Sequence, residues 1–137
     1  SVVVARQVDG FATSPVGSPA QFEPGLMAYR FSSSMYYANA ELFSEQVLDL
    51  VNGADPRLDW FCIVASAIAD VDYSAAAKLR SVHGVLEEKG VRLVFALVSD
   101  DVRTQLDRYG ITDLIGKDAF FGSGDALLNA YHQREQQ

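Results

Sequence analysis

An apolar run in the middle of the chain ends in two carboxylates and a serine, and a helix-forming segment follows at once. The residues are Asp70, Asp72 and Ser74. This pattern places them at the carboxyl end of a buried strand, which is the edge of an α/β sheet where ligands and partners bind. The helix end that follows favours a negative group, including a phosphate carried on a serine. With Tyr73 and Ala75, these residues form the predicted ligand- or partner-binding loop.

Two interpretations of this loop remain open. In the first, Asp72 or Ser74 only caps the helix by accepting hydrogen bonds from its first amides, which is worth about 1 kcal/mol. In the second, the loop binds a partner or carries a phosphate. A phosphate adds a charge of about −1.5 to −2. The helix dipole would stabilise that charge, whereas Asp70 and Asp72 would repel it.

A hydrolytic serine is not supported by the positions of the histidines. The chain has two, His83 and His132, and a nucleophile needs a base within hydrogen-bond reach. His83 lies more than two helical turns beyond Ser74, roughly 13 Å along the axis, and His132 is near the polar carboxyl end. We therefore predict that the domain is not an enzyme.

Metal and nucleotide motifs are also absent from the sequence. One cysteine and two distant histidines do not form a clustered ligand set, and a magnesium site made from Asp70 and Asp72 alone would be weakly specified. The segment from Gly110 to Gly116 differs from a phosphate-binding loop because five residues separate the two glycines and Asp118 replaces Ser or Thr. We predict no metal and no resident cofactor.

The composition restricts the partners. The 137 residues carry a net charge of −7 and a pI near 4.6, which argues against nucleic-acid binding. The lone Cys62 excludes an internal disulfide and suits the cytosol. No apolar stretch reaches the roughly 18 residues that span a bilayer. Because the chain starts at Ser1 without Met, we expect residues 1–137 to be one domain excised from a longer protein.

Alternating strands and helices predict an α/β fold with a mostly parallel sheet. The expected strands are 2–8, 26–31, 60–67, 91–98 and 119–121, and the expected helices begin after Asn39, at Ser74, after Ser99 or Asp100, and after Ser123. Residues 10–25 are expected to form a mobile Pro/Gly loop, and 133–137 a frayed tail. Tyr36, Tyr37 and Trp60 are expected in the core, with exposed partner contacts as the alternative.

Several motifs resemble those of the STAS domain, named for sulfate transporters and anti-sigma factor antagonists. They are Leu26-Met27-Ala28-Tyr29-Arg30-Phe31, Tyr37-Ala38-Asn39-Ala40-Glu41, Asp72-Tyr73-Ser74-Ala75, Ser99-Asp100-Asp101-Val102 and Phe120-Phe121. The second motif is similar to the branch found on SulP-type anion transporters. The Asp72 motif resembles the family's Asp-x-Ser-Gly loop, with Ala75 in place of the glycine and the bulky Tyr73 before the serine.

The resemblance implies a mostly parallel sheet with an antiparallel N-terminal strand, flanked by about four helices. It implies a regulatory domain on the cytoplasmic face of the membrane, attached to the transmembrane unit of a sulfate-type transporter. It also implies a regulatory protein and weakly bound GTP or GDP as partners. The alternative is a soluble anti-sigma factor antagonist that is switched by phosphorylation of Ser74.

Overall fold

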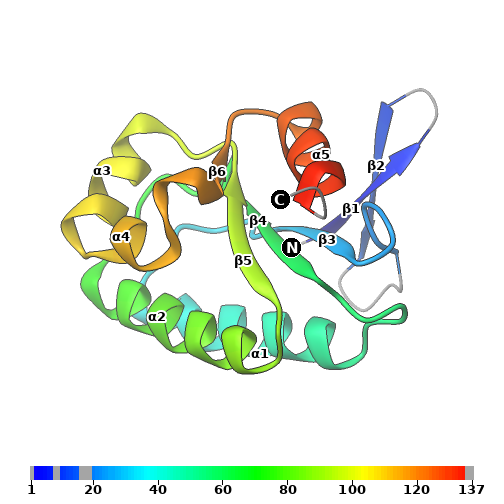
Figure 1. Cartoon of the computed structure of the whole chain (residues 1–137). Helices are drawn as coiled ribbons and strands as arrows, with labels where there is room; N and C mark the ends of the chain where they lie inside the picture. The colour runs from blue at the N-terminus through cyan, green and yellow to red at the C-terminus, as the bar shows by residue number, and fades with distance from the viewer. Residues whose placement is uncertain (1, 8–9, 16–19, 135–137) are drawn as a thin grey trace.

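The computed structural model describes residues 2–7, 10–15 and 20–134, and its centre is a six-stranded sheet with helices on both faces (Figure 1). The strands are β1 (Val2–Gln7), β2 (Gly10–Pro15), β3 (Leu26–Arg30), β4 (Trp60–Val64), β5 (Arg92–Ala96) and β6 (Phe120–Phe121). The helices are α1 (Tyr37–Asn52), α2 (Tyr73–Glu88), α3 (Asp100–Arg108), α4 (Ile111–Ile115) and α5 (Gly124–Gln133), with a 3₁₀ turn at Lys117–Ala119.

The strand order confirms the predicted mostly parallel α/β fold. Neighbours follow the order β2-β1-β3-β4-β5-β6, and β3, β4, β5 and β6 are parallel. The β1 strand pairs antiparallel with both β2 and β3. Because parallel strands share one direction, the connections that follow β3, β4, β5 and β6 all emerge at the same carboxyl edge of the sheet.

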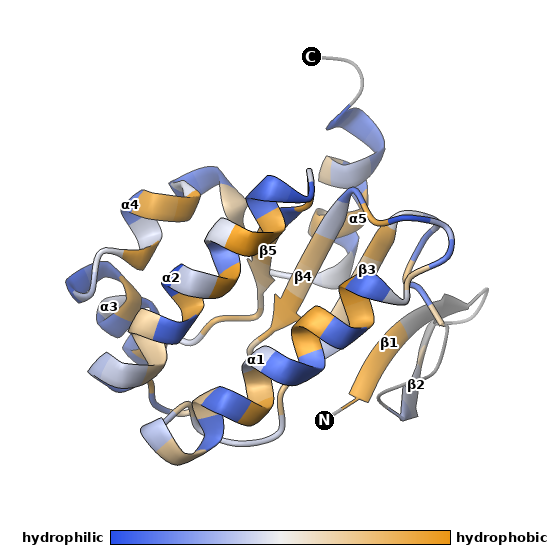
Figure 2. Ribbon diagram, turned by 90° about the horizontal axis from the view of Figure 1, so that it is seen from below, coloured by the Kyte–Doolittle hydropathy of each residue, from blue (hydrophilic) through white to orange (hydrophobic). Residues whose placement is uncertain are grey.

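The two faces of the sheet are covered unequally. Helices α1 and α2 lie side by side across one face, whereas α5 covers the other (Figure 1). The larger core cluster lies on the α1/α2 face and includes Tyr29, Phe43 and Leu79. The smaller cluster lies under α5 and includes Cys62 and Leu127. Figure 2 shows the central strands as largely hydrophobic ribbons behind α1 and α2, in which hydrophobic and hydrophilic residues alternate.

Local signals explain most of the helix ends. The side chains of Asp72, Ser99 and Ser123 cap α2, α3 and α5 by accepting hydrogen bonds from backbone amides three residues later. Helix α2 ends at Gly90, whose φ of +75° is readily adopted by glycine. The amides of Gly90 and Val91 donate to carbonyls of the last turn, which is a Schellman closure.

The predicted start of the first helix was wrong. Asn39 lies inside α1, and its side-chain amide donates to the carbonyl of Ser34 at 2.8 Å. The N-cap residue is Tyr36, which makes no side-chain cap. The acceptor for the free amide of Tyr37 comes instead from Asp72 in a distant connection. A cap supplied from another loop leaves no local signal in the sequence.

Two further boundaries need correction. Residues 10–15 were predicted as loop but form β2, because Gly10 and Pro15 stand at the ends of the strand and do not interrupt its pairing with β1. Residues 16–19 lie outside the described residues. The strand predicted over 60–67 ends at Val64, and Ile68 closes a turn by donating to the carbonyl of Ala65 at 3.0 Å.

The carboxyl end is more ordered than predicted at its first two positions. Helix α5 includes Gln133, and the Arg134 side chain donates to the carbonyl of Tyr131 at 2.7 Å. Residues 135–137 lie outside the described residues. Among the helices of residues 20–134, none has the length and apolar character needed to cross a membrane.

Candidate functional site

The predicted loop lies at the carboxyl edge of the sheet, in the connection between β4 and α2. Its backbone is paired with the connection that follows β3: the Met35 amide donates to the Asp70 carbonyl at 2.9 Å, and the Asp72 amide donates to the Met35 carbonyl at 3.0 Å. This pairing forms a parallel bridge between Met35 and Val71. The backbones of the two connections are therefore joined at this point. We call residues 70–75 the Asp corner.

Asp72 caps two helices at once. Its Oδ1 accepts a 2.8 Å hydrogen bond from the Ala75 amide at the start of α2, and its Oδ2 accepts a 3.1 Å bond from the Tyr37 amide at the start of α1. Each amide points out of a positive helix end, so the carboxylate is stabilised by both. Asp72 therefore caps α2, as one of the two interpretations expects, and it also caps a second helix.

Asp70 ties the same corner to α1 and α3. Its carboxylate accepts a hydrogen bond from the Gln105 side-chain amide and a 2.9 Å bond from the Tyr36 hydroxyl. The Gln105 carbonyl oxygen in turn accepts from the Val71 amide at 2.7 Å. The hydrogen bonds from Gln105 and Tyr36 lower the pKa of Asp70. The bond to this carboxylate also raises the pKa of Tyr36.

The corner presents its side chains to solvent unevenly. Tyr73 and Ser74, the first two residues of α2, are exposed, whereas Asp70 and Asp72 are half-buried. The Ala75 side chain is buried in the larger core cluster, so it offers a partner no surface. The predicted residues therefore form one contiguous site, but only four of the five reach its surface.

Three contacts of this site were missed by the sequence analysis. Tyr36 and Tyr37 were expected in the core but are exposed, whereas Trp60 is buried as expected. The exposure of the two tyrosines had no local signal, because it depends on where α1 begins, and that end is capped by Asp72 from another connection. Nothing in the sequence marked Gln105 as a contact of this site, since a glutamine on a polar helix is usually a solvated surface residue.

A groove opens on the same edge of the sheet as the Asp corner, although none of residues 70–75 lines it. It has a volume of about 490 Å³ and is lined by Ser66 from the β4–α2 connection, by Ser99 and Arg103, and by Phe120. The Arg103 guanidinium lies 3.9 Å from the centre of the Phe120 ring. Leu97, which also lines the groove, has a φ of +58°. That conformation costs a leucine about 1 kcal/mol or more.

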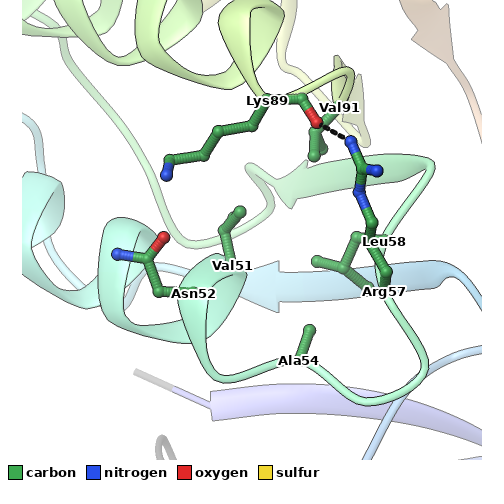
Figure 3. Close-up of a pocket in the computed structure, with 7 residues that line it drawn as sticks. All are labelled: Val51, Asn52, Ala54, Arg57, Leu58, Lys89 and Val91. Carbon is green, nitrogen blue, oxygen red and sulfur yellow. Dashed lines mark hydrogen bonds between the residues drawn. The ribbon is translucent and has the colours of Figure 1, made fainter.

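A second pocket lies at the opposite edge, between the carboxyl ends of α1 and α2 (Figure 3). Its volume is about 280 Å³, and Val51, Leu58 and Val91 form its apolar wall. The Arg57 guanidinium donates to the Lys89 carbonyl across one side of it. None of the five predicted residues lines this pocket.

The Asp corner carries groups that can bind a ligand or partner. Its two carboxylates hold amide and hydroxyl donors, and its serine is exposed. The histidines contact carboxylates elsewhere: His83 lies 3.7 Å from Glu87, and His132 lies 2.7 Å from Glu23.

Comparison with known proteins places the domain in a family. The STAS domain profile matches residues 18–126. A probable sulfate transporter of Mycobacterium tuberculosis strain H37Rv is 30% identical over 111 residues, which cover 81% of this chain and 20% of that protein. The chain thus spans about one fifth of the length of this relative.

Two solved structures share the fold. The murine solute carrier 26 family member A9 anion transporter, in its inward-facing state, matches with a TM-score of 0.78 and 20% identity, covering 95% of this chain and 22% of that one. A putative anti-sigma factor antagonist of Thermotoga maritima matches with a TM-score of 0.63 and 12% identity, covering 75% of this chain and 84% of that one. The chain belongs to the STAS domain family, and its homologues include sulfate transporters of the SulP family.

Proposed function

We propose that this domain is a non-catalytic regulatory and interaction domain, carried on the cytoplasmic face of the membrane by a sulfate-type anion transporter. It acts through the Asp corner. A ligand or partner bound there favours one arrangement of the domain against the transmembrane unit. Such coupling requires that the partner binds two states of the transporter with different affinity.

The double cap of Asp72 supports this proposal most strongly. One half-buried carboxylate joins the first turns of α1 and α2, and the neighbouring Asp70 joins them to α3 through Gln105. A group that binds beside these carboxylates therefore acts on three helices together. Because packed elements tend to have discrete arrangements, a small displacement at such a junction is transmitted over a distance.

Two exposed serines of α2 allow a matched test. Ser74 lies at the Asp corner, and Ser81 lies two turns further along the same helix. In the full transporter reconstituted in vesicles, we expect Ser74→Arg to change the rate of sulfate uptake and Ser81→Arg to leave it unchanged. Equal uptake by the wild type and both variants would contradict the role of the corner. Unchanged uptake after removal of the whole domain would contradict a regulatory role altogether.

Guanine nucleotide is the small ligand that we propose for this edge. The groove of about 490 Å³ lies within the size range of small-molecule sites. Its lining includes the Arg103 guanidinium, which lies over the Phe120 ring and pairs with Asp107 at 3.2 Å, and a phosphate would compete with Asp107 for this cation. We expect GTP or GDP to shift backbone amide signals of residues 70–79 and of the groove. Signals that stay unmoved at millimolar nucleotide would remove this proposal.

A soluble anti-sigma factor antagonist is the second candidate, favoured by the exposed Ser74 hydroxyl at the start of α2 and by the shared fold. In that case a serine kinase that acts on anti-sigma factor antagonists would phosphorylate Ser74 stoichiometrically. The phosphate would change the affinity of the domain for its protein partner. Phosphate incorporation that persists in Ser74→Ala would contradict this assignment.

A further inference from the structure

Three tyrosines are exposed where α1 and α2 begin. Tyr36, Tyr37 and Tyr73 expose 42%, 79% and 74% of their surface, whereas Tyr29 and Tyr131 expose 0% and 2%. We call the three exposed residues the tyrosine surface. A tyrosine buries about 150–250 Å² when covered, so these rings expose a large apolar area, although one edge contact joins Tyr73 to the Tyr109 ring at 6.0 Å between centroids.

Hydrogen bonds at the helix ends link the segments that carry these tyrosines. Tyr37 is the first residue of α1 and Tyr73 is the first residue of α2. Asp72, which precedes Tyr73, accepts the 3.1 Å hydrogen bond from the Tyr37 amide, and Tyr36 is held by its 2.9 Å bond to Asp70. The two helices lie side by side in both views (Figure 1, Figure 2). The Tyr37 backbone and the Tyr36 side chain are therefore both held by carboxylates of the Asp corner.

The charges around the tyrosine surface are negative. Asp70 and Asp72 receive hydrogen bonds only from neutral donors: amides, a hydroxyl and the Gln105 side chain. Among the described residues, no lysine, arginine or histidine forms an ion pair with either carboxylate. Two carboxylates without a cationic side-chain partner, beside three exposed rings, are complementary to a partner whose cationic side chains have long apolar stems.

We propose that the tyrosine surface is the docking site for a Lys/Arg-rich cytoplasmic segment of the transmembrane unit. This inference rests on the function proposed above. Cytoplasmic loops of membrane proteins carry an excess of lysine and arginine. Such side chains stack on tyrosine faces through cation–π contact, while their charges approach Asp70 and Asp72. Tyrosine is also enriched in the cores of protein interfaces.

Charge excludes a lipid surface as the occupant of this site. The cytoplasmic leaflet is negative, and so are the carboxylates of the site and the chain as a whole, which has a net charge of −7. A nucleic acid is repelled for the same reason. A basic protein segment is the occupant that satisfies both the rings and the carboxylates.

Site-specific photocrosslinking in the full transporter tests the docking. A benzoylphenylalanine at position 37 or 73 replaces an exposed ring, and one at Leu114 on α4, which exposes 38% of its surface, serves as the control. After irradiation of membrane vesicles, we expect positions 37 and 73 to crosslink to Lys/Arg-rich loop peptides of the transmembrane unit, and position 114 not to. Asp70→Asn should lower the yield by up to about fivefold, the upper limit for one exposed ion pair.

Crosslinks from 37 and 73 to other proteins, to lipid or to no partner above the Leu114 control would overturn the docking site. So would a yield at both positions that is insensitive to Asp70→Asn and to salt. The failure of the proposed function is a separate observation. If removal of the domain changes uptake while the crosslinks are missing, the regulatory role stands and only this docking surface is wrong.

Discussion

The backbone amide of Tyr37 donates a 3.1 Å hydrogen bond to the carboxylate of Asp72, which lies 35 residues later in the chain. The same carboxylate caps its own helix at Ala75. Asp72→Ala therefore removes the acceptor of two helix ends, and we expect a loss of roughly 2 kcal/mol in the free energy of unfolding. Urea denaturation measures this loss.

Ser123 provides the matched control for that substitution, because its hydroxyl caps α5 alone. We expect Ser123→Ala to cost about 1 kcal/mol. Asp72→Ser should be intermediate, since a serine can still cap α2, as Ser99 caps α3. A loss for Asp72→Ala no larger than that for Ser123→Ala would show that the bond to Tyr37 contributes nothing to stability.

The fold was predictable because its signals are local. The apolar runs of β4 and β5 and the caps Asp72, Ser99 and Ser123 are all read from neighbouring residues. The site was predictable only in part. Its carboxylates follow a strand and precede a helix, which is a local pattern. The partners of those carboxylates are not local.

Gln105 is a partner of the Asp corner that the sequence could not predict. It lies 35 residues from Asp70 along the chain, on a helix with no feature that marks this side chain, and yet it bonds both the Asp70 carboxylate and the Val71 amide. Tyr37 was assigned to the core because aromatic side chains are usually buried. Its exposure follows from its place at the first turn of α1, which depends on a cap from another loop.

Gln105 also governs the titration of Asp70. The hydrogen bonds from Gln105 and Tyr36 lower the pKa of Asp70 below its ordinary value of 3.8. A carboxyl group with a lower pKa in the folded state contributes stability above its unfolded pKa, and this contribution is lost as the pH falls through the folded pKa. The stability that Asp70 contributes is therefore lost only in the acid range, below about pH 4.

Carboxyl NMR titration of Gln105→Ala checks this relationship. We expect the pKa of Asp70 to rise toward its ordinary value. Asp107 is the internal control, because the Thr112 hydroxyl and Arg103 lower its pKa without Gln105. If the titration of Asp70 is the same in the wild type and the variant, the Gln105 hydrogen bond does not hold the carboxylate in solution.

Alanine should have opposite effects on stability at two glycines, one inside α2 and one just beyond its carboxyl end. Gly84 lies inside α2, and a Cβ there would meet no atom within 4 Å. Gly84→Ala should stabilise the domain by about 0.5–1 kcal/mol, because alanine loses less backbone entropy in a helix. Gly90 has a φ of +75°, and a Cβ there would lie 3.0 Å from the Arg57 guanidinium.

Gly90→Ala should therefore destabilise the domain, by about 1 kcal/mol or more from the left-handed backbone alone. Thermal unfolding of the two variants side by side measures both effects. Equal shifts of the melting temperature in the same direction would be incompatible with a left-handed Gly90 at the end of α2.

Cys62 reports on how α5 covers its face of the sheet. The thiol is fully buried in the smaller core cluster with Leu127 and Tyr131, and burial raises its pKa. A thiol reagent should therefore not react with the folded domain, because the reactive species is the thiolate. Labelling then requires α5 to leave the sheet or the whole domain to unfold.

The face-specific variants Leu127→Ala and Leu79→Ala separate these two routes. Both remove a buried leucine and should each cost about 2–5 kcal/mol. Leu127 belongs to α5 and packs in the smaller cluster, whereas Leu79 belongs to α2 and packs in the larger cluster. If α5 opens locally, Leu127→Ala accelerates Cys62 labelling well beyond its effect on global unfolding, whereas Leu79→Ala accelerates labelling only in proportion to that effect. Labelling rates that follow global stability in both variants would mean that α5 and the rest of the sheet unfold as one unit.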